Sequence, residues 1–109
     1  MAVERLETME AFEKATGEGV CLVDFSAPWC GPCKAQDPII ETLAGDFDGR
    51  ALIAEVDVSE TREIAQRFGI QSIPTLVLFR GGREMERFVG LQPPEVLTDA
   101  IEDVLTNSC

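Results

Sequence analysis

The residues of this sequence best suited to chemistry are two cysteines, in the segment Trp29-Cys30-Gly31-Pro32-Cys33. An apolar run precedes them and a helical pattern follows, so both are expected where a strand ends and a helix begins. The free N–H groups and the positive dipole end of a helix N-terminus stabilise a thiolate on Cys30, and the thiolate is the nucleophilic form. Because two residues separate them, Cys33 can reach Cys30 and resolve a mixed disulfide formed there. The pair therefore predicts a dithiol that cycles with a disulfide.

The remaining reactive residue types narrow the possible chemistry. The sequence contains no histidine and no tyrosine, which removes the usual general base and the commonest metal ligand. The alternative for the cysteine pair is to supply two of the four ligands of a zinc site. The sequence has no second close cysteine pair to supply the other two, so no metal is expected. Four cysteines in 109 residues are too few for a disulfide-stapled scaffold. Cys21 is expected in the core, and the terminal Cys109 is expected to be exposed.

The charge of the chain limits its partners. Lys and Arg number 9 against 20 Asp and Glu, and the net charge of −11 repels nucleic-acid phosphates and anionic membrane surfaces. The acidic excess suits a basic partner or, more simply, a solvated surface that keeps the protein soluble. No apolar stretch is long enough for a membrane span, and the first residues lack the apolar core of a secretory signal. These features predict a soluble cytoplasmic monomer with a single domain over residues 1–109.

Hydrophobic periodicity predicts the elements that position the cysteine pair. Residues 20–25 form an apolar run typical of a strand buried on both faces, with Asp24 as its only charge. Residues 30–47 carry apolar side chains at helical spacing, with a bend expected at Pro38 because proline removes one backbone hydrogen bond. Residues 52–58 alternate as a strand, which places Glu55 and Ala54 on opposite faces.

The rest of the chain predicts how these elements are completed. An apolar strand at 75–79 and a partner at 84–89 are joined by Gly81-Gly82, whose freedom to adopt positive φ suits a hairpin turn. The other expected elements are an extended start at 3–6, a helix at 8–17, a short helix near 61–68 and a helix from 94. Strands interleaved with helices, followed by a hairpin and a helix, predict an α/β fold: a central mixed sheet of four to five strands flanked by about four helices.

The motifs on these elements resemble those of the thioredoxin family over nearly the whole chain. The sequence VDF (23–25) precedes WCGPC (29–33), and Lys34 and Pro38 follow the cysteines in the expected helix. The sequence IPT (73–75) stands at the start of one expected strand, and VG (89–90) stands at the end of the next. The resemblance implies that Cys30 attacks a substrate disulfide, that Cys33 resolves it, and that Asp24 is a buried acid exchanging protons with Cys33. It also implies a cis bond before Pro74, disulfide-containing protein substrates, a thioredoxin reductase as partner, and no cofactor. The loops that line the family's substrate groove correspond here to Trp29, Gly31, Pro32, Ile73, Pro74, Val89 and Gly90.

Two positions depart from the family's pattern. Glu55 stands where thioredoxins usually have a lysine beside the buried acid, and Ser26 replaces a common tryptophan just before the motif. Desolvation is expected to raise the pKa of Asp24, and a second carboxylate at position 55 raises it further. We therefore predict a coupled carboxyl pair. Two alternatives stay open: Glu55 turns to solvent, or Asp24 is a structural polar residue with no part in catalysis.

Three functions are compatible with these residues. An intact nucleophile and resolving cysteine favour a protein disulfide reductase over a binding module of the same fold whose redox chemistry is incidental. A disulfide oxidase or isomerase is the nearest rival. The dipeptide Gly31-Pro32 resembles that of reducing thioredoxins, whereas a histidine there would stabilise the thiolate and make the pair more oxidising. The sequence therefore predicts reduction of disulfides in other proteins.

Overall fold

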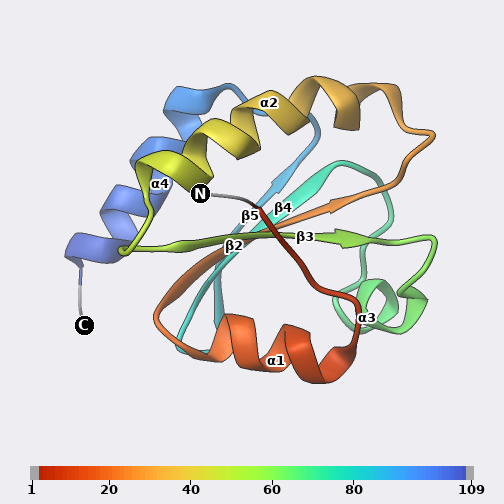
Figure 1. Ribbon diagram of the computed structural model, residues 1–109, viewed down its shortest axis with the longest axis horizontal. Helices are drawn as coiled ribbons and strands as arrows, with labels where there is room; N and C mark the ends of the chain where they lie inside the picture. Colours follow the sequence, from red (N-terminus) through yellow and green to blue (C-terminus); the bar gives the residue numbers. More distant parts are fainter. Residues whose placement is uncertain (1–2, 108–109) are drawn as a thin grey trace.

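Five strands form one mixed sheet in the order β1-β3-β2-β4-β5, in a computed structural model that describes residues 3–107 (Figure 1). The strands are β1 (Glu4–Arg5), β2 (Val20–Ser26), β3 (Leu52–Asp57), β4 (Thr75–Arg80) and β5 (Arg83–Val89). The helices are α1 (Met9–Gly17), α2 (Gly31–Asp46), α3 (Arg62–Arg67) and α4 (Pro94–Thr106). β1, β3 and β2 are parallel neighbours, whereas β4 is antiparallel to β2 and to β5. This order confirms the α/β fold predicted from the sequence.

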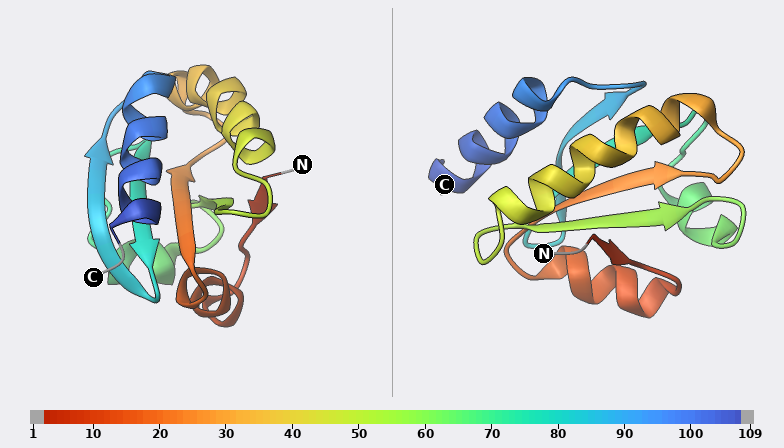
Figure 2. Two further views of the ribbon diagram at one scale, coloured as in Figure 1. Left: turned by 90° about the vertical axis from the view of Figure 1, so that its left-hand side faces the viewer. Right: turned by 45° about the horizontal axis from the view of Figure 1, so that its top comes forward.

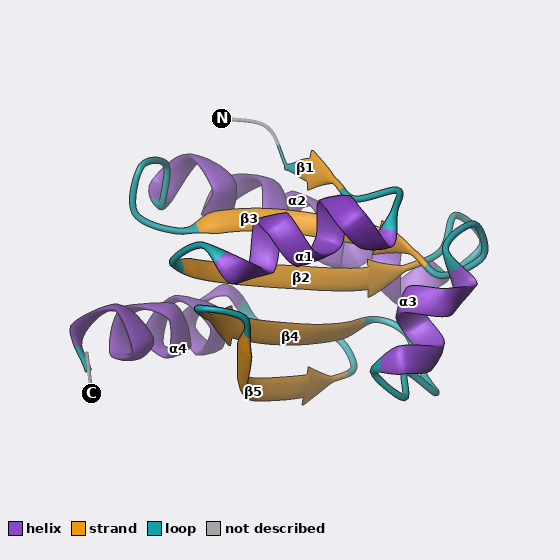
Figure 3. Cartoon of the chain, turned by 90° about the horizontal axis from the view of Figure 1, so that it is seen from below, coloured by secondary structure: helices purple, strands orange, loops and turns teal. Residues whose placement is uncertain are grey.

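Helices cover both faces of the sheet, α2 and α4 on one and α1 and α3 on the other (Figure 1, Figure 2). Figure 3 shows the second face, with α1 in front of the strands, α3 near their right-hand ends, and α2 and α4 behind. Each face has its own core: Leu43 of α2 packs with Leu97 of α4, and Phe12 of α1 packs with Ile64 of α3. β2 is therefore buried on both sides, as predicted. Because side chains alternate along a strand, Asp24 shares the α2 face with Leu22.

Helix α2 begins one residue later than the sequence analysis placed it. Cys30 takes the N-cap position instead of a place in the first turn, and Pro32 lies in that turn, where a missing N–H is no loss. The helix continues through Pro38 to Asp46 without a break, so the bend expected at Pro38 stays a prediction. The start of the helix thus places Cys30 against its first N–H groups.

The remaining boundaries differ from the predicted ones by a few residues. β1 is confined to Glu4–Arg5, and β3 ends at Asp57. Gly81 and Gly82 have φ values of +57° and +85°, which confirms the predicted hairpin. Within residues 3–107, no helix has the length and apolar character needed to cross a membrane. Cys109 lies outside the described residues, so its expected exposure stays a prediction.

Candidate active site

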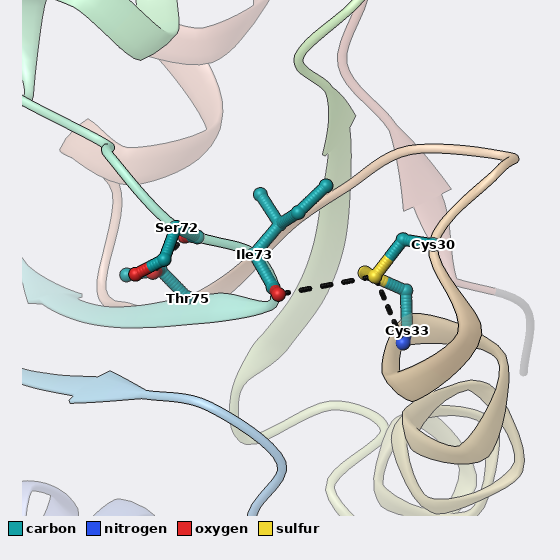
Figure 4. Close-up of a disulfide and its surroundings, with 5 residues drawn as sticks. All are labelled: Cys30, Cys33, Ser72, Ile73 and Thr75. Carbon is teal, nitrogen blue, oxygen red and sulfur yellow. Dashed lines mark hydrogen bonds between the residues drawn. A yellow bond between two sulfur atoms is a disulfide. The ribbon is translucent and has the colours of Figure 1, made fainter.

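Cys30 and Cys33 form a disulfide at the start of α2, with their Cα atoms 5.3 Å apart (Figure 4). β2 ends at Ser26, and a short loop leads from it into the helix. As the N-cap residue, Cys30 accepts a hydrogen bond at its Sγ from the backbone N–H of Cys33, over 3.2 Å. A negative charge on this sulfur after reduction would be stabilised by the same N–H and by the helix dipole. The strand-to-helix placement predicted from the sequence is therefore confirmed.

The two sulfurs are recessed behind exposed neighbours. Cys30 is 6% exposed and Cys33 is 2% exposed, whereas the adjacent Trp29 is 72% exposed. Gly31 and Pro32, between the cysteines, are also exposed. Trp29, Gly31 and Pro32 are therefore the solvent-exposed residues of this segment, and Cys30 is slightly more exposed than Cys33.

Two loops from elsewhere in the chain meet beside Cys30. The Ile73-Pro74 bond is cis, as the family resemblance implies, and the carbonyl oxygen of Ile73 lies 3.8 Å from the Sγ of Cys30 (Figure 4). The Thr75 hydroxyl donates to the carbonyl of Ser72 over 2.6 Å and closes this turn. The backbone N–H of Gly90 donates to the Pro74 carbonyl over 2.8 Å. Val89, which precedes Gly90, is 62% exposed. The residues expected to line a groove are thus brought together at one edge of the disulfide.

Asp24 is buried in β2 without a partner. It is 1% exposed, and among the described residues neither of its carboxylate oxygens has a hydrogen-bond partner. Burial raises the pKa of Asp24 to about 7, with further increases from the negative charges of Asp37 and Glu55. The pKa increase predicted from the sequence is confirmed. A carboxyl group with this pKa can take up or release a proton near neutral pH.

Glu55 lies directly beside Asp24 in the register of β2 and β3. It is half-buried and lines a pocket of about 220 Å³ together with Arg5, Cys33 and Asp37. Burial raises the pKa of Glu55, Arg5 lowers it, and Asp37 raises it again. Glu55 therefore stays at the pocket instead of turning fully to solvent, and two neighbouring carboxyl groups have raised pKa values. Whether they titrate as a coupled pair stays a prediction.

Comparison with known proteins decides the family to which the chain belongs. A sequence model of the family described as Thioredoxin matches residues 3–103. The chain belongs to the thioredoxin family. It is 46% identical over 102 residues to a thioredoxin of Staphylococcus saprophyticus, a match covering 94% of this chain and 97% of that relative.

Solved thioredoxin structures have the same fold. A mutant thioredoxin from Halobacterium salinarum is 36% identical with a TM-score of 0.91, over 99% of this chain and 95% of that one. A thioredoxin from Trypanosoma brucei brucei is 26% identical with a TM-score of 0.89, over 97% and 93% of the two chains. Family membership and the Cys30–Cys33 disulfide together identify a thiol-disulfide oxidoreductase.

The departure of Glu55 from the family's usual lysine gives a testable expectation. Glu55→Gln removes one negative charge beside Asp24, so the pKa of Asp24 should fall below its value of about 7. Glu55→Lys adds a positive charge and should lower it by roughly 2, the larger effect of the two. It should also stabilise the oxidised protein near neutral pH. Carboxyl titration by NMR measures both changes, and an Asp24 pKa unchanged in both variants would contradict the predicted coupling.

The sequence analysis missed two residues of this site. Asp37 lies four residues after Cys33 on α2 and lines the same pocket, a relation that helical spacing could have revealed. Gln36 is a buried polar residue on the stripe that also carries Ile40 and Leu43. A single amide among apolar positions at helical spacing was the available signal for it.

Proposed function

We propose that this thioredoxin-family protein reduces disulfide bonds in other proteins through Cys30 and Cys33. In the first step, the Cys30 thiolate attacks one sulfur of the substrate disulfide; a bond forms to Cys30, and the other substrate sulfur leaves as a thiolate that takes a proton. In the second step, Cys33 attacks the Cys30 sulfur and releases the second substrate thiol. The substrate gains two electrons and two protons, and the protein is left with the Cys30–Cys33 disulfide seen in the structure.

One observation carries this proposal: the Sγ of Cys30 is an N-cap acceptor, 3.2 Å from the N–H of Cys33. A helix N-terminus stabilises negative charge without requiring a neighbouring base, which suits a chain that contains no histidine. Cys30 is also the more exposed of the two sulfurs, at 6% against 2%. Cys30 is accordingly the nucleophile and Cys33 the resolving cysteine.

Asp24 is proposed to accept the proton of Cys33 during the second step. Cys33 must lose its proton to attack, and a buried carboxyl group whose pKa is about 7 can accept one near neutral pH. Cys33 lines the pocket that also contains Glu55, the neighbour of Asp24. The proton is proposed to pass between Cys33 and Asp24 through a water molecule.

The substrate is proposed to lie in a groove beside the disulfide. The Ile73-Pro74 turn and the Val89-Gly90 segment meet there through the hydrogen bond from Gly90 to Pro74. Exposed apolar side chains at such a site favour an extended peptide segment around the target disulfide. The proposed binding residues are Trp29, Gly31, Pro32, Ile73, Pro74, Val89 and Gly90.

The proposed partners are disulfide-containing proteins and a thioredoxin reductase that restores the dithiol. We propose a monomer that acts in the cytoplasm, and the net charge of −11 disfavours nucleic acids and anionic membrane surfaces as partners. Mixing the protein with candidate reductases and following reduction of insulin tests this role. Turnover with one reductase supports a disulfide reductase, and failure with every reductase together with failure after chemical reduction would favour a binding module.

Trp29 offers a further test of the proposed groove. Its ring is 72% exposed, so Trp29→Ala removes apolar contact area available to a protein substrate without opening the core. We expect the KM for insulin to rise by about tenfold with little change in thermal stability. Met85→Ala is the matched control, because Met85 is 47% exposed and lies toward the hairpin end of β5. Equal KM values for wild type and Trp29→Ala would remove Trp29 from the groove.

A further inference from the structure

Helix α2 carries a fully buried amide on the face that packs against the sheet. Gln36 is 0% exposed and lies three residues after Cys33, in line with the buried Ile40 and Leu43. A buried amide costs free energy unless its polar atoms find partners, whereas an apolar side chain of similar size fills the position without that requirement. The partners of this amide therefore indicate its role.

Both partners belong to the backbone of one residue, Gln92, in the loop between β5 and α4. The Nε2 of Gln36 donates to the Gln92 carbonyl over 3.1 Å, and the N–H of Gln92 donates to the Oε1 of Gln36 over 2.8 Å. Two hydrogen bonds running in opposite directions fix both the position and the orientation of the Gln92 backbone relative to Gln36, as such pairs do between neighbouring strands. The loop is thus fastened to the helix that carries both active-site sulfurs.

The hydrogen bonds continue from Gln92 to the proposed groove. Its side-chain Nε2 donates to the carbonyl of Gly90 over 3.2 Å and to that of Val89 over 3.4 Å. The N–H of Gly90 donates in turn to the Pro74 carbonyl over 2.8 Å. One network therefore joins α2, the Val89–Gln92 segment and the Ile73-Pro74 turn.

We propose that Gln36 is a positioning residue that holds the Val89–Gln92 segment in the shape that binds substrate, an inference that rests on the proposed function. The segment presents Val89 and Leu91, which are 62% and 50% exposed, and these side chains need a fixed backbone to offer a preformed surface. Gln36 is buried and does not itself reach the substrate. Releasing the segment adds an ordering cost to substrate binding and leaves the Cys30–Cys33 chemistry intact.

The test compares a protein disulfide with a small one. Gln36→Met keeps the length of the side chain and removes both hydrogen bonds to Gln92. We expect its KM for insulin to rise by about tenfold with kcat within about twofold of wild type, because the segment acts on binding alone. The rate with 5,5′-dithiobis(2-nitrobenzoic acid), which is too small to span the groove, should stay unchanged. Hydrogen exchange at the Gln92 N–H should become faster, which reports release of the segment directly.

Two further variants separate positioning from a general loss of stability. Ile40→Val weakens the same face of α2 without touching Gln92, so it should leave both the insulin KM and the exchange of the Gln92 N–H at wild-type values. Gln92→Ala removes only the side-chain contacts to Val89 and Gly90 and should raise the insulin KM by less than Gln36→Met does. If Gln36→Met does not fold, Gln36→Leu serves the same comparison.

The outcomes distinguish this inference from the function on which it rests. A higher insulin KM in Gln36→Met, with unchanged reduction of the small disulfide, supports the positioning role. An unchanged insulin KM despite faster exchange at Gln92 overturns it, and so does an equal loss of rate with both disulfides. If wild type itself reduces neither disulfide, the proposed function fails and the inference fails with it.

Discussion

Cys30→Ser is expected to abolish disulfide reduction, lowering the rate by at least about 1,000-fold, because the serine hydroxyl stays protonated at neutral pH and does not attack sulfur. Cys33→Ser should also stop turnover, but at a later step. Cys30 still attacks the substrate, and the mixed disulfide then accumulates because the resolving sulfur is missing. Non-reducing electrophoresis of each variant with insulin measures this difference as a covalent adduct present only in Cys33→Ser.

The matched control for the two serine variants is Cys21→Ala. Cys21 is fully buried in β2, and burial, followed by the charge of Glu4, raises the pKa of its thiol to about 12. Its sulfur therefore stays protonated and inert at neutral pH. Insulin reduction by Cys21→Ala should equal that of wild type. An adduct that accumulates in Cys30→Ser and not in Cys33→Ser would reverse the assigned roles.

The second large effect concerns the pH dependence of stability. Asp24 has a pKa of about 7 in the folded protein, against an ordinary value of 3.8 for an aspartate. Between these two values the folded protein holds a proton that the unfolded chain has released, so the free energy of unfolding decreases as pH rises. This single group should remove about 4 kcal/mol of stability between about pH 4 and pH 8. The loss is complete once the pH exceeds the folded-state pKa.

Asp24→Asn isolates this contribution, because the amide has a similar shape and does not titrate. Urea unfolding of the oxidised proteins across that pH range should show wild type losing about 4 kcal/mol relative to Asp24→Asn. Glu60→Gln, which changes an exposed carboxylate near α3, is the matched control and should follow wild type. Parallel curves for wild type and Asp24→Asn would show that the Asp24 carboxyl has an ordinary pKa in the folded protein.

The parts of the site that depend on local sequence could be predicted. The apolar run before the cysteines and the helical spacing after them place Cys30 at a helix N-terminus, and the structure makes it the N-cap residue. Alternation assigns Asp24 and Glu55 each to one face of its own strand, whereas the family resemblance implied that they lie side by side, and the register of the two strands confirms this. Side chains return to the same face every two residues in a strand and about every 3.6 residues in a helix. These patterns appear within short segments, so a single sequence reveals them.

The parts that depend on how distant segments pack could not be derived in the same way. The contact of Gly90 with Pro74 depends on how β5 returns to the cysteine edge of the sheet, and only the family resemblance indicated that these loops lie together. The approach of Asp37 to Glu55 depends on the rotation of α2 above the sheet. The bonds from Gln36 to Gln92 span 56 residues, and no local pattern predicts such a pair.

The most direct test of the proposed mechanism is the order in which the two active-site thiols react. The fully reduced protein is treated at neutral pH with iodoacetamide below one equivalent, and tandem mass spectrometry locates the label within the peptide that contains both cysteines. Because Cys30 is the more exposed sulfur and accepts the N–H of Cys33, it should carry the label roughly tenfold more often than Cys33. Preferential labelling of Cys33, or equal labelling of both, would contradict the assignment of Cys30 as the nucleophile.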